Sequence, residues 1–163
     1  MNKAVFLDRD GVINKKGASY YISREDDFEL NEGVTDALRY FSSKSYLLII
    51  ITNQGGISKG LFTISGLEKL HEKLRIMLQN EGIKLTEIYY CPHHPDNEAC
   101  NCRKPGTLLF EQAVQKYDID TSQSWMIGDS PSDIAAADKM GIRGILIPTN
   151  GNMMELIVNK GII

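Results

Sequence analysis

Residues 1–14 read MNKAVFLDRDGVIN and are the most informative part of the chain about its fold. Its apolar run, residues 4–7, ends abruptly in Asp8-Arg9-Asp10-Gly11, the pattern of a buried strand that runs into a loop. In doubly wound α/β folds the carboxyl ends of parallel strands carry the chemistry. Two carboxylates at such an end can share a cation, while one attacks and the other moves protons. An acidic turn that only solvates the strand end is the alternative, and it would be preferred if this pair stood alone.

Apolar and helical patterns alternate along the rest of the chain. Short apolar runs predict strands, and apolar residues three and four positions apart predict helices. The predicted strands are 3–7, 47–52, 87–91, 124–127 and 144–147. The predicted helices are 34–43, 64–79, 107–117, 132–140 and 153–158. Strands separated by helices predict a Rossmann-like, doubly wound α/β domain over residues 1–163, with a mainly parallel sheet covered on both faces.

Length, charge and apolar content bound the function. A chain of 163 residues suits one domain with its own core. The net charge of −3 gives no sign of a nucleic-acid or anionic-membrane partner. No apolar run approaches membrane-spanning length, and the N-terminus lacks the pattern of a signal peptide. We therefore expect a cytoplasmic monomer that acts on a small molecule.

Two further loops suit a phosphoryl group. Thr52-Asn53-Gln54-Gly55-Gly56 follows the second predicted strand, so a hydroxyl and several backbone N–H groups meet the sheet edge. The second loop, Arg103-Lys104-Pro105-Gly106, precedes a predicted helix. The ammonium of Lys104 is a compact charge that suits a phosphoryl oxygen, and the planar guanidinium of Arg103 suits a second anionic group. Taken singly, each loop has an ordinary interpretation, a connecting turn or two solvated cations.

A fourth loop, Gly128-Asp129-Ser130-Pro131-Ser132-Asp133, follows the fourth predicted strand. Asp129 could join Asp8 on a hard cation such as Mg²⁺, which prefers carboxylates and water. Asp133 could either interact only with the helix dipole or orient Lys104. All four loops should meet at one edge of the sheet.

The motifs DRDG, TNQ, RKP and GDSPSD, in this order and spacing, resemble the four motifs of the haloacid dehalogenase (HAD) superfamily of phosphohydrolases. Residues 8–14, 27–34 and 52–54, with the Cys/His loop before Arg103, are more narrowly similar to the D,D-heptose bisphosphate phosphatase and histidinol-phosphatase group. The resemblance covers nearly the whole chain and implies a HAD-like fold without a large cap domain. Gly55 and Ser130 stand where the group often has Ser and Lys.

The resemblance also implies roles for individual residues. Asp8 would be the nucleophile that forms an aspartyl-phosphate, and Asp10 would be the general acid/base. The residues implied to be catalytic are Asp8, Asp10, Thr52 and Lys104. Those implied to bind substrate are Asn53, Gln54 and Arg103. Those implied to bind the catalytic Mg²⁺ are Asp8, Asp10 and Asp129.

All three cysteines lie in the loop CPHHPDNEACNC, residues 91–102. Three thiols and an imidazole suit a closed, structural, tetrahedral zinc site. The expected Zn²⁺ ligands are Cys91, His93, Cys100 and Cys102, with His94 as the alternative to His93. The loop could instead hold three reduced thiols in a polar setting, or a strained disulfide. The resemblance favours zinc, which would fix the adjoining Arg103 and Lys104.

These expectations converge on a Mg²⁺-dependent phosphatase of small phosphorylated metabolites. The resemblance implies D-glycero-D-manno-heptose 1,7-bisphosphate, which would lose its 7-phosphate in the synthesis of nucleotide-activated heptose, with histidinol phosphate as the second choice. A phospho-accepting receiver module also uses Asp, Thr, Lys and Mg²⁺, but it would lack the zinc loop. A zinc-stabilised nucleic-acid module is disfavoured by the acidic balance.

Three other residues carry weaker expectations. His71, on the predicted helix 64–79, is expected to be a solvated surface histidine. Tyr20 and Tyr21 follow the DRDG loop and could close over a sugar, although a surface loop that packs its own aromatic rings is an equal alternative.

Overall fold

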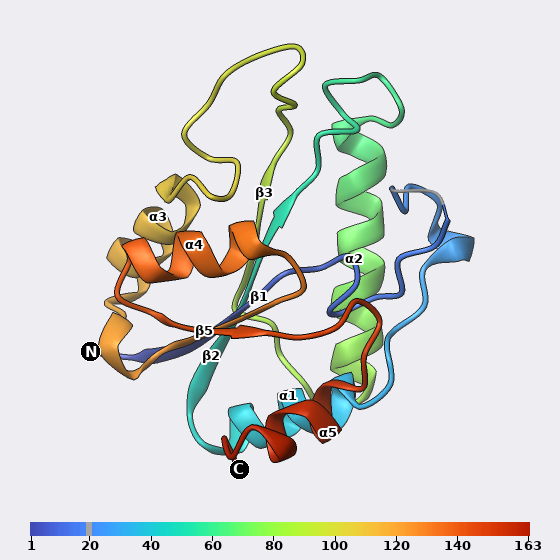
Figure 1. Cartoon of the computed structure of the whole chain (residues 1–163). Coiled ribbons are helices and arrows are strands. Elements are labelled where there is room, and N and C mark those ends of the chain that lie inside the picture. The colour runs from blue at the N-terminus through green and yellow to red at the C-terminus, as the bar shows by residue number, and fades with distance from the viewer. Residues whose placement is uncertain (19–20) are drawn as a thin grey trace.

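In the computed structural model, which describes residues 1–18 and 21–163, strand β1 (Lys3–Leu7) lies at the centre of a five-stranded sheet (Figure 1). The strand order is β3-β2-β1-β4-β5, and every neighbouring pair is parallel. The other strands are β2 (Tyr46–Asn53), β3 (Glu87–Cys91), β4 (Trp125–Gly128) and β5 (Arg143–Leu146). The expected doubly wound α/β fold is confirmed.

Helices cover both faces of this sheet because β1 is apolar on both sides. Successive side chains of a strand point to opposite faces. Val5 and Leu7 pack into a core with α1, α2 and α5, whereas Ala4 and Phe6 pack into a second core with α3 and α4. The helices are α1 (Val34–Ser43), α2 (Ile64–Asn80), α3 (Leu108–Tyr117), α4 (Pro131–Lys139) and α5 (Met153–Asn159). Full burial of a side chain such as Val5, Leu7 or Phe6 stabilises the fold by about 1.5–3 kcal/mol.

The predicted helices and strands are all present, and no end differs from its prediction by more than one residue. The second strand begins at Tyr46 and ends at Asn53 rather than spanning 47–52. Helix α4 begins at Pro131, one residue before the predicted start, because proline suits the first turn of a helix. Among the described residues, no helix combines the length and hydropathy that a membrane crossing requires.

The strand order places the DRDG loop at the point where the chain changes direction across the sheet. After β1 the chain adds β2 and β3 on one side, and it then returns to add β4 and β5 on the other. Loops that leave adjacent strands at this switch point diverge and leave a crevice at the carboxyl edge. Asp8, Asn53 and Asp129 end or directly follow the three central strands, so they meet at this crevice.

Candidate active site

A cavity of about 380 Å³ opens at this edge of the sheet. Its wall takes residues from all four motifs that the sequence singled out. The expected site residues that line it are Asp8, Asp10, Thr52, Asn53, Arg103, Lys104 and Asp129. The motifs, which span more than a hundred positions of the chain, therefore form one site.

The side of the cavity around Asp8 is acidic. Oxygens of Asp8, Asp129 and Asp133 lie within 4.8 Å of one another, and we call these three carboxylates the acidic cluster. Lys104 is buried beside it, with its Nζ 2.9 Å from Asp8 Oδ1 and 2.7 Å from Asp133 Oδ1. Lys104 Nζ also donates to the carbonyl oxygen of Ile51 at 2.6 Å. Asp133 thus pairs with Lys104, and its Oδ2 also accepts from the backbone N–H of Ser130 at 3.1 Å at the start of α4, so it is not a partner of the helix N-terminus alone.

The acidic cluster holds three carboxylates, whereas Lys104, the cation paired with two of them, balances one charge. Burial raises the pKa of Asp8, and Asp133 and Asp10 add to the rise against the opposing pull of Lys104. Burial also raises the pKa of Asp129, although a 2.7 Å hydrogen bond from Thr149 Oγ1 opposes it. Burial would lower the pKa of Lys104, but Asp8 and Asp133 raise it overall, so Lys104 stays charged. A hard divalent cation, which takes carboxylate oxygens, fits this surplus of negative charge.

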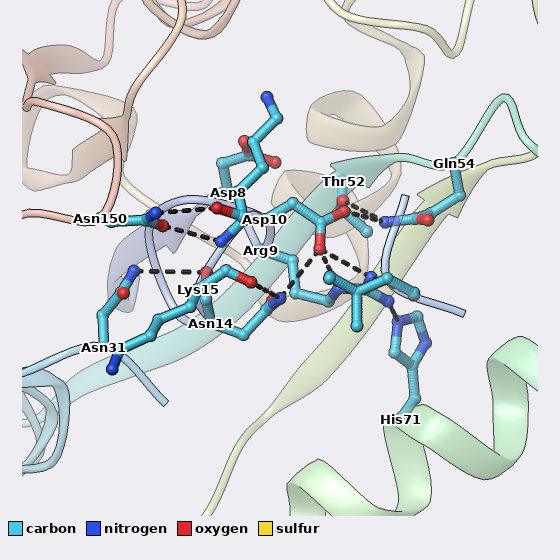
Figure 2. Close-up of polar contacts among 12 residues, drawn as sticks. Asp8, Arg9, Asp10, Asn14, Lys15, Asn31, Thr52, Gln54, His71 and Asn150 are labelled. Atoms are coloured by element: carbon cyan, nitrogen blue, oxygen red, sulfur yellow. Dashed lines mark hydrogen bonds and ion pairs between the residues drawn. The ribbon is translucent and has the colours of Figure 1, made fainter. Parts of the chain in front are cut away.

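The carboxylate of Asp10 is held from behind the cavity wall by the hydrogen-bond donors of three buried residues (Figure 2). Arg9 donates to Asp10 Oδ1 through Nη2 at 2.8 Å and through Nε at 3.3 Å. Asn14 Nδ2 donates to the same oxygen at 3.0 Å, and Gln54 Nε2 donates to Oδ2 at 2.9 Å. Burial alone would raise the pKa of Asp10, but the charge of Arg9 and these hydrogen bonds lower it. The carboxylate of Asp10, implied as a Mg²⁺ ligand, is directed at these donors and is not part of the acidic cluster.

The TNQ loop, residues 52–54, lines only part of the cavity, and its side chains also hold other residues of the site in position. Asn53 Oδ1 accepts from the backbone N–H of Lys104 at 3.0 Å, and its Nδ2 donates to the carbonyl oxygen of Lys104 at 3.2 Å. Gln54 is fully buried, and its Nε2 also donates to Thr52 Oγ1 at 3.0 Å. Gln54, expected to bind substrate, therefore lies behind Thr52 and Asp10.

The Cys/His loop brings its four expected ligands together. Cys91 Sγ lies 3.6 Å from Cys100 Sγ and 3.0 Å from Cys102 Sγ, and His93 Nδ1 lies 3.1 Å from Cys102 Sγ. All four ligand atoms fall within 4.8 Å of one another, as the ligands of one tetrahedral zinc ion must. His94 is engaged elsewhere, since its Nδ1 accepts from the backbone N–H of Asp96 at 3.1 Å. The donor set fits structural zinc, with His93 as the imidazole ligand.

Arg103 follows this loop and lines the cavity, as do Lys16 and Tyr21. Arg103 Nη1 donates to the carbonyl oxygen of His93 at 3.3 Å, so the guanidinium of Arg103 is hydrogen-bonded to the backbone of an expected zinc ligand. A Cβ on Gly55 would lie 3.0 Å from that same Nη1, so the missing side chain gives Arg103 its room. Tyr21 lines the cavity and packs against Phe62, with ring centroids 5.9 Å apart, whereas Tyr20 lies outside the described residues.

The prediction for His71 is wrong. His71 is 6% exposed, and its Nε2 lies 3.0 Å from Nη1 of the fully buried Arg9. A signal for its burial exists in the sequence. Position 71 is four residues after Leu67 and three before Leu74, so it falls on the apolar face of the helix. Arg9, which the sequence did not single out, has no comparable signal because an arginine in an acidic turn is ordinarily solvated.

Known proteins share both the sequence and the fold. A HAD-hydrolase-like family model matches residues 101–159. The D-glycero-beta-D-manno-heptose-1,7-bisphosphate 7-phosphatase of Haemophilus ducreyi is 40% identical over 155 residues, covering 91% of this chain and 84% of that protein. The D-glycero-alpha-D-manno-heptose-1,7-bisphosphate 7-phosphatase of Photorhabdus laumondii is 39% identical over 154 residues, covering 90% and 83%.

A solved structure extends the comparison to three dimensions. The D,D-heptose 1,7-bisphosphate phosphatase of B. bronchiseptica, crystallised with magnesium and phosphate, matches this fold with a TM-score of 0.84 at 30% identity. The match covers 96% of this chain and 86% of that one. Relatives at this identity, aligned over most of both chains, share a family as well as a fold. The chain therefore belongs to the HAD-like family of heptose 1,7-bisphosphate 7-phosphatases.

Proposed function

We propose that this chain removes the 7-phosphate of D-glycero-D-manno-heptose 1,7-bisphosphate, in the synthesis of nucleotide-activated heptose. The observation that carries the proposal is the ion pair of Lys104 with Asp8 of the acidic cluster, in a cavity that Arg103 also lines. A nucleophile, a cation and a recognition fork thus face the same cavity. The relatives named for this activity support the substrate.

The main obstacle to phosphomonoester hydrolysis is the negative charge of the phosphoryl group, and the residues around Asp8 can offset that charge. Asp8 and Asp129 would hold Mg²⁺, which supplies positive charge to the phosphoryl oxygens when bound. Lys104, already charged and fixed by Asp8 and Asp133, would neutralise the same oxygens. Thr52 lines the cavity and offers its hydroxyl group. A carboxylate oxygen of Asp8 then attacks phosphorus, the bond to the sugar oxygen breaks, and an aspartyl-phosphate forms.

Asp10 would move the protons of both steps. Its donors keep it ionised in the free protein, but a bound polyanionic phosphoryl group raises the pKa of a neighbouring carboxyl group. With substrate bound, Asp10 would give a proton to the departing sugar oxygen. The resulting carboxylate would then take a proton from the water that attacks the aspartyl-phosphate.

Zinc would act at a distance from the reaction. Bound by Cys91, His93, Cys100 and Cys102, it would hold a polar loop that has little apolar surface to order it. Arg103 and Lys104 come directly after the last cysteine, so the same ion would fix where both cations point. This role is structural, since four protein ligands leave no open position on the metal.

A substrate panel tests the function. Phosphate release should be fastest with heptose 1,7-bisphosphate and slower with hexose 6-phosphates and histidinol phosphate, and it should continue over many turnovers. A receiver-like module would instead stop near one equivalent. A clear preference for histidinol phosphate would overturn the proposed substrate.

Arg103 gives the residue-level version of this test. The fork should bind the phosphate that does not react, so Arg103→Ala should lower kcat/KM for the bisphosphate by about 1.5–3 kcal/mol, the range for a hydrogen bond to a charged group. A small monophosphate does not reach Arg103 and should lose much less. Arg103→Lys should recover only part of the loss, because a point charge cannot replace a bidentate fork. Equal losses on both substrates would place Arg103 among the groups that contact the reacting phosphate.

A further inference from the structure

The side chain of Arg9 is a fully buried cation inside the DRDG loop. Besides its two hydrogen bonds to Asp10, its Nη2 lies 3.3 Å from the carbonyl oxygen of Ile22, and its guanidinium carbon lies 5.9 Å from the ring centroid of Phe28. The remaining nitrogen, Nη1, lies 3.0 Å from His71 Nε2 on helix α2. A buried guanidinium is tolerated only when its donors are satisfied. Each nitrogen of Arg9 therefore has a partner within the described chain.

The contact with His71 has only one possible direction. A guanidinium group carries donors and no acceptor, so His71 Nε2 must accept and the ring proton must sit on Nδ1. Burial and Arg9 lower the pKa of His71 to about 3, with Arg75 adding to the shift and Asp10 opposing it. His71 is therefore a neutral hydrogen-bond acceptor at neutral pH. The ring of Tyr90 packs against it, with centroids 5.9 Å apart.

These contacts form a chain from helix α2 to the cavity, which Figure 2 shows as His71, Arg9 and Asp10 in line. We propose that His71 is a positioning residue, which anchors the guanidinium of Arg9 so that Arg9 holds the carboxylate of Asp10 in place for proton transfer. The inference rests on the proposed function, because it assigns Asp10 to proton transfer. Without an acceptor at position 71, Nη1 loses this hydrogen-bond partner, and the guanidinium that orients Asp10 keeps the carbonyl oxygen of Ile22 and the ring of Phe28 as its other contacts.

This role predicts a dependence on the leaving group that a purely structural role lacks. An alkyl phosphate releases a strongly basic alkoxide, which needs the proton from Asp10, whereas 4-nitrophenyl phosphate releases a stable phenolate that does not. The parameter kcat/KM reports the first phosphoryl transfer, before the aspartyl-phosphate that all substrates share. Misplacing Asp10 should therefore lower kcat/KM selectively for alkyl phosphates.

The experiment compares mannose 6-phosphate with 4-nitrophenyl phosphate at saturating Mg²⁺. His71→Leu should lower kcat/KM for mannose 6-phosphate by about tenfold or more, which is a partial share of the 10²–10⁴ expected for complete loss of general acid–base catalysis. It should change kcat/KM for the aryl substrate by no more than about threefold. His71→Gln, whose amide oxygen can accept from Nη1, should restore the alkyl substrate to within about threefold. The control is Leu74→Ala, a buried substitution on the same face of α2, which should affect both substrates alike.

Three outcomes would overturn the inference: equal losses of His71→Leu on both substrates, no loss on either, or a His71→Gln variant as impaired as His71→Leu. If His71→Leu does not fold, His71→Gln and the shorter His71→Asn make the comparison between two amides, of which only Gln should keep the alkyl activity. A wild-type protein that hydrolyses neither of these phosphates nor heptose 1,7-bisphosphate would overturn the proposed function itself. A wild-type protein active on both, whose variants show no selectivity, would overturn the role of His71 alone.

Discussion

Asp8 and Asp10 stand two residues apart at one strand end, yet their surroundings are opposite. Asp8 faces two other carboxylates and shares Lys104 with one of them, and its pKa is raised. Asp10 accepts hydrogen bonds from Arg9, Asn14 and Gln54, and its pKa is lowered. The acidic side is left with charge that a cation and a phosphoryl group can complete, whereas the donor side is complete without any ligand. Two chemically identical side chains thus acquire different roles from their environments.

The largest expected effect comes from replacing Asp8 in the acidic cluster. Asp8→Asn keeps the shape of the side chain but cannot form an aspartyl-phosphate, so phosphate release should fall by at least about 10⁴-fold on every substrate. Circular dichroism should show an intact fold, because Asp8 lies at the crevice and not in either core. Near-normal phosphate release by this variant would refute the assignment of the nucleophile.

The next effect separates the two sides. Asp10→Asn should lower kcat/KM for alkyl phosphates by about 10²–10⁴-fold, the usual contribution of a general acid or base. The loss on 4-nitrophenyl phosphate should be smaller, since its leaving group needs no proton. A uniform loss over a series of leaving groups would mean that Asp10 acts on the phosphoryl group, as Asp8 does.

A third test concerns the Cys/His loop, which ends next to Arg103 and Lys104 and so affects the acidic cluster indirectly. Metal analysis of the purified protein should find about one zinc per chain, because the four ligands form one tetrahedral site. Cys100→Ser should weaken zinc binding by at least about 100-fold and lower both thermal stability and activity, as the loop that ends at Lys104 loosens. Absence of zinc, together with silent Cys→Ser changes at positions 91, 100 and 102, would leave this region as a polar loop.

The smallest effect concerns the stability of the donor side. The pKa of His71 is about 3 in the folded protein and about 6.5 in an unfolded chain, so below pH 6.5 the unfolded state binds a proton that the folded state does not. Stability should therefore fall as the pH falls, with His71 contributing a loss of about 2 kcal/mol between pH 7 and pH 5. Urea denaturation of the wild type and of His71→Gln at both pH values measures it, since the glutamine does not titrate. Parallel pH profiles would show that His71 is not held neutral.

Much of this arrangement was predictable because its signals are local. The continuous apolar runs 3–7 and 47–52 predict buried parallel strands, and Gly or Pro residues mark where several helices begin or end. Polar motifs at the carboxyl ends of those strands had to meet, since the ends of parallel strands share one edge. The four expected zinc ligands likewise lie within twelve consecutive residues, so the sequence alone indicates that they can reach one metal ion.

The partner of each polar group depends instead on how distant segments pack. The ion pair between Lys104 and Asp133 joins positions 29 residues apart, and the contact between Arg9 and His71 joins positions 62 residues apart. Neither the burial of Gln54 nor the separation of Asp10 from the acidic cluster follows from residue type. Apolar burial has no direction and is read from periodicity along the chain, whereas hydrogen bonds and ion pairs depend on distance and angle between segments that only packing brings together. The sequence therefore determined the fold and the place of the reaction, and the packed structure determined how its two carboxylates differ.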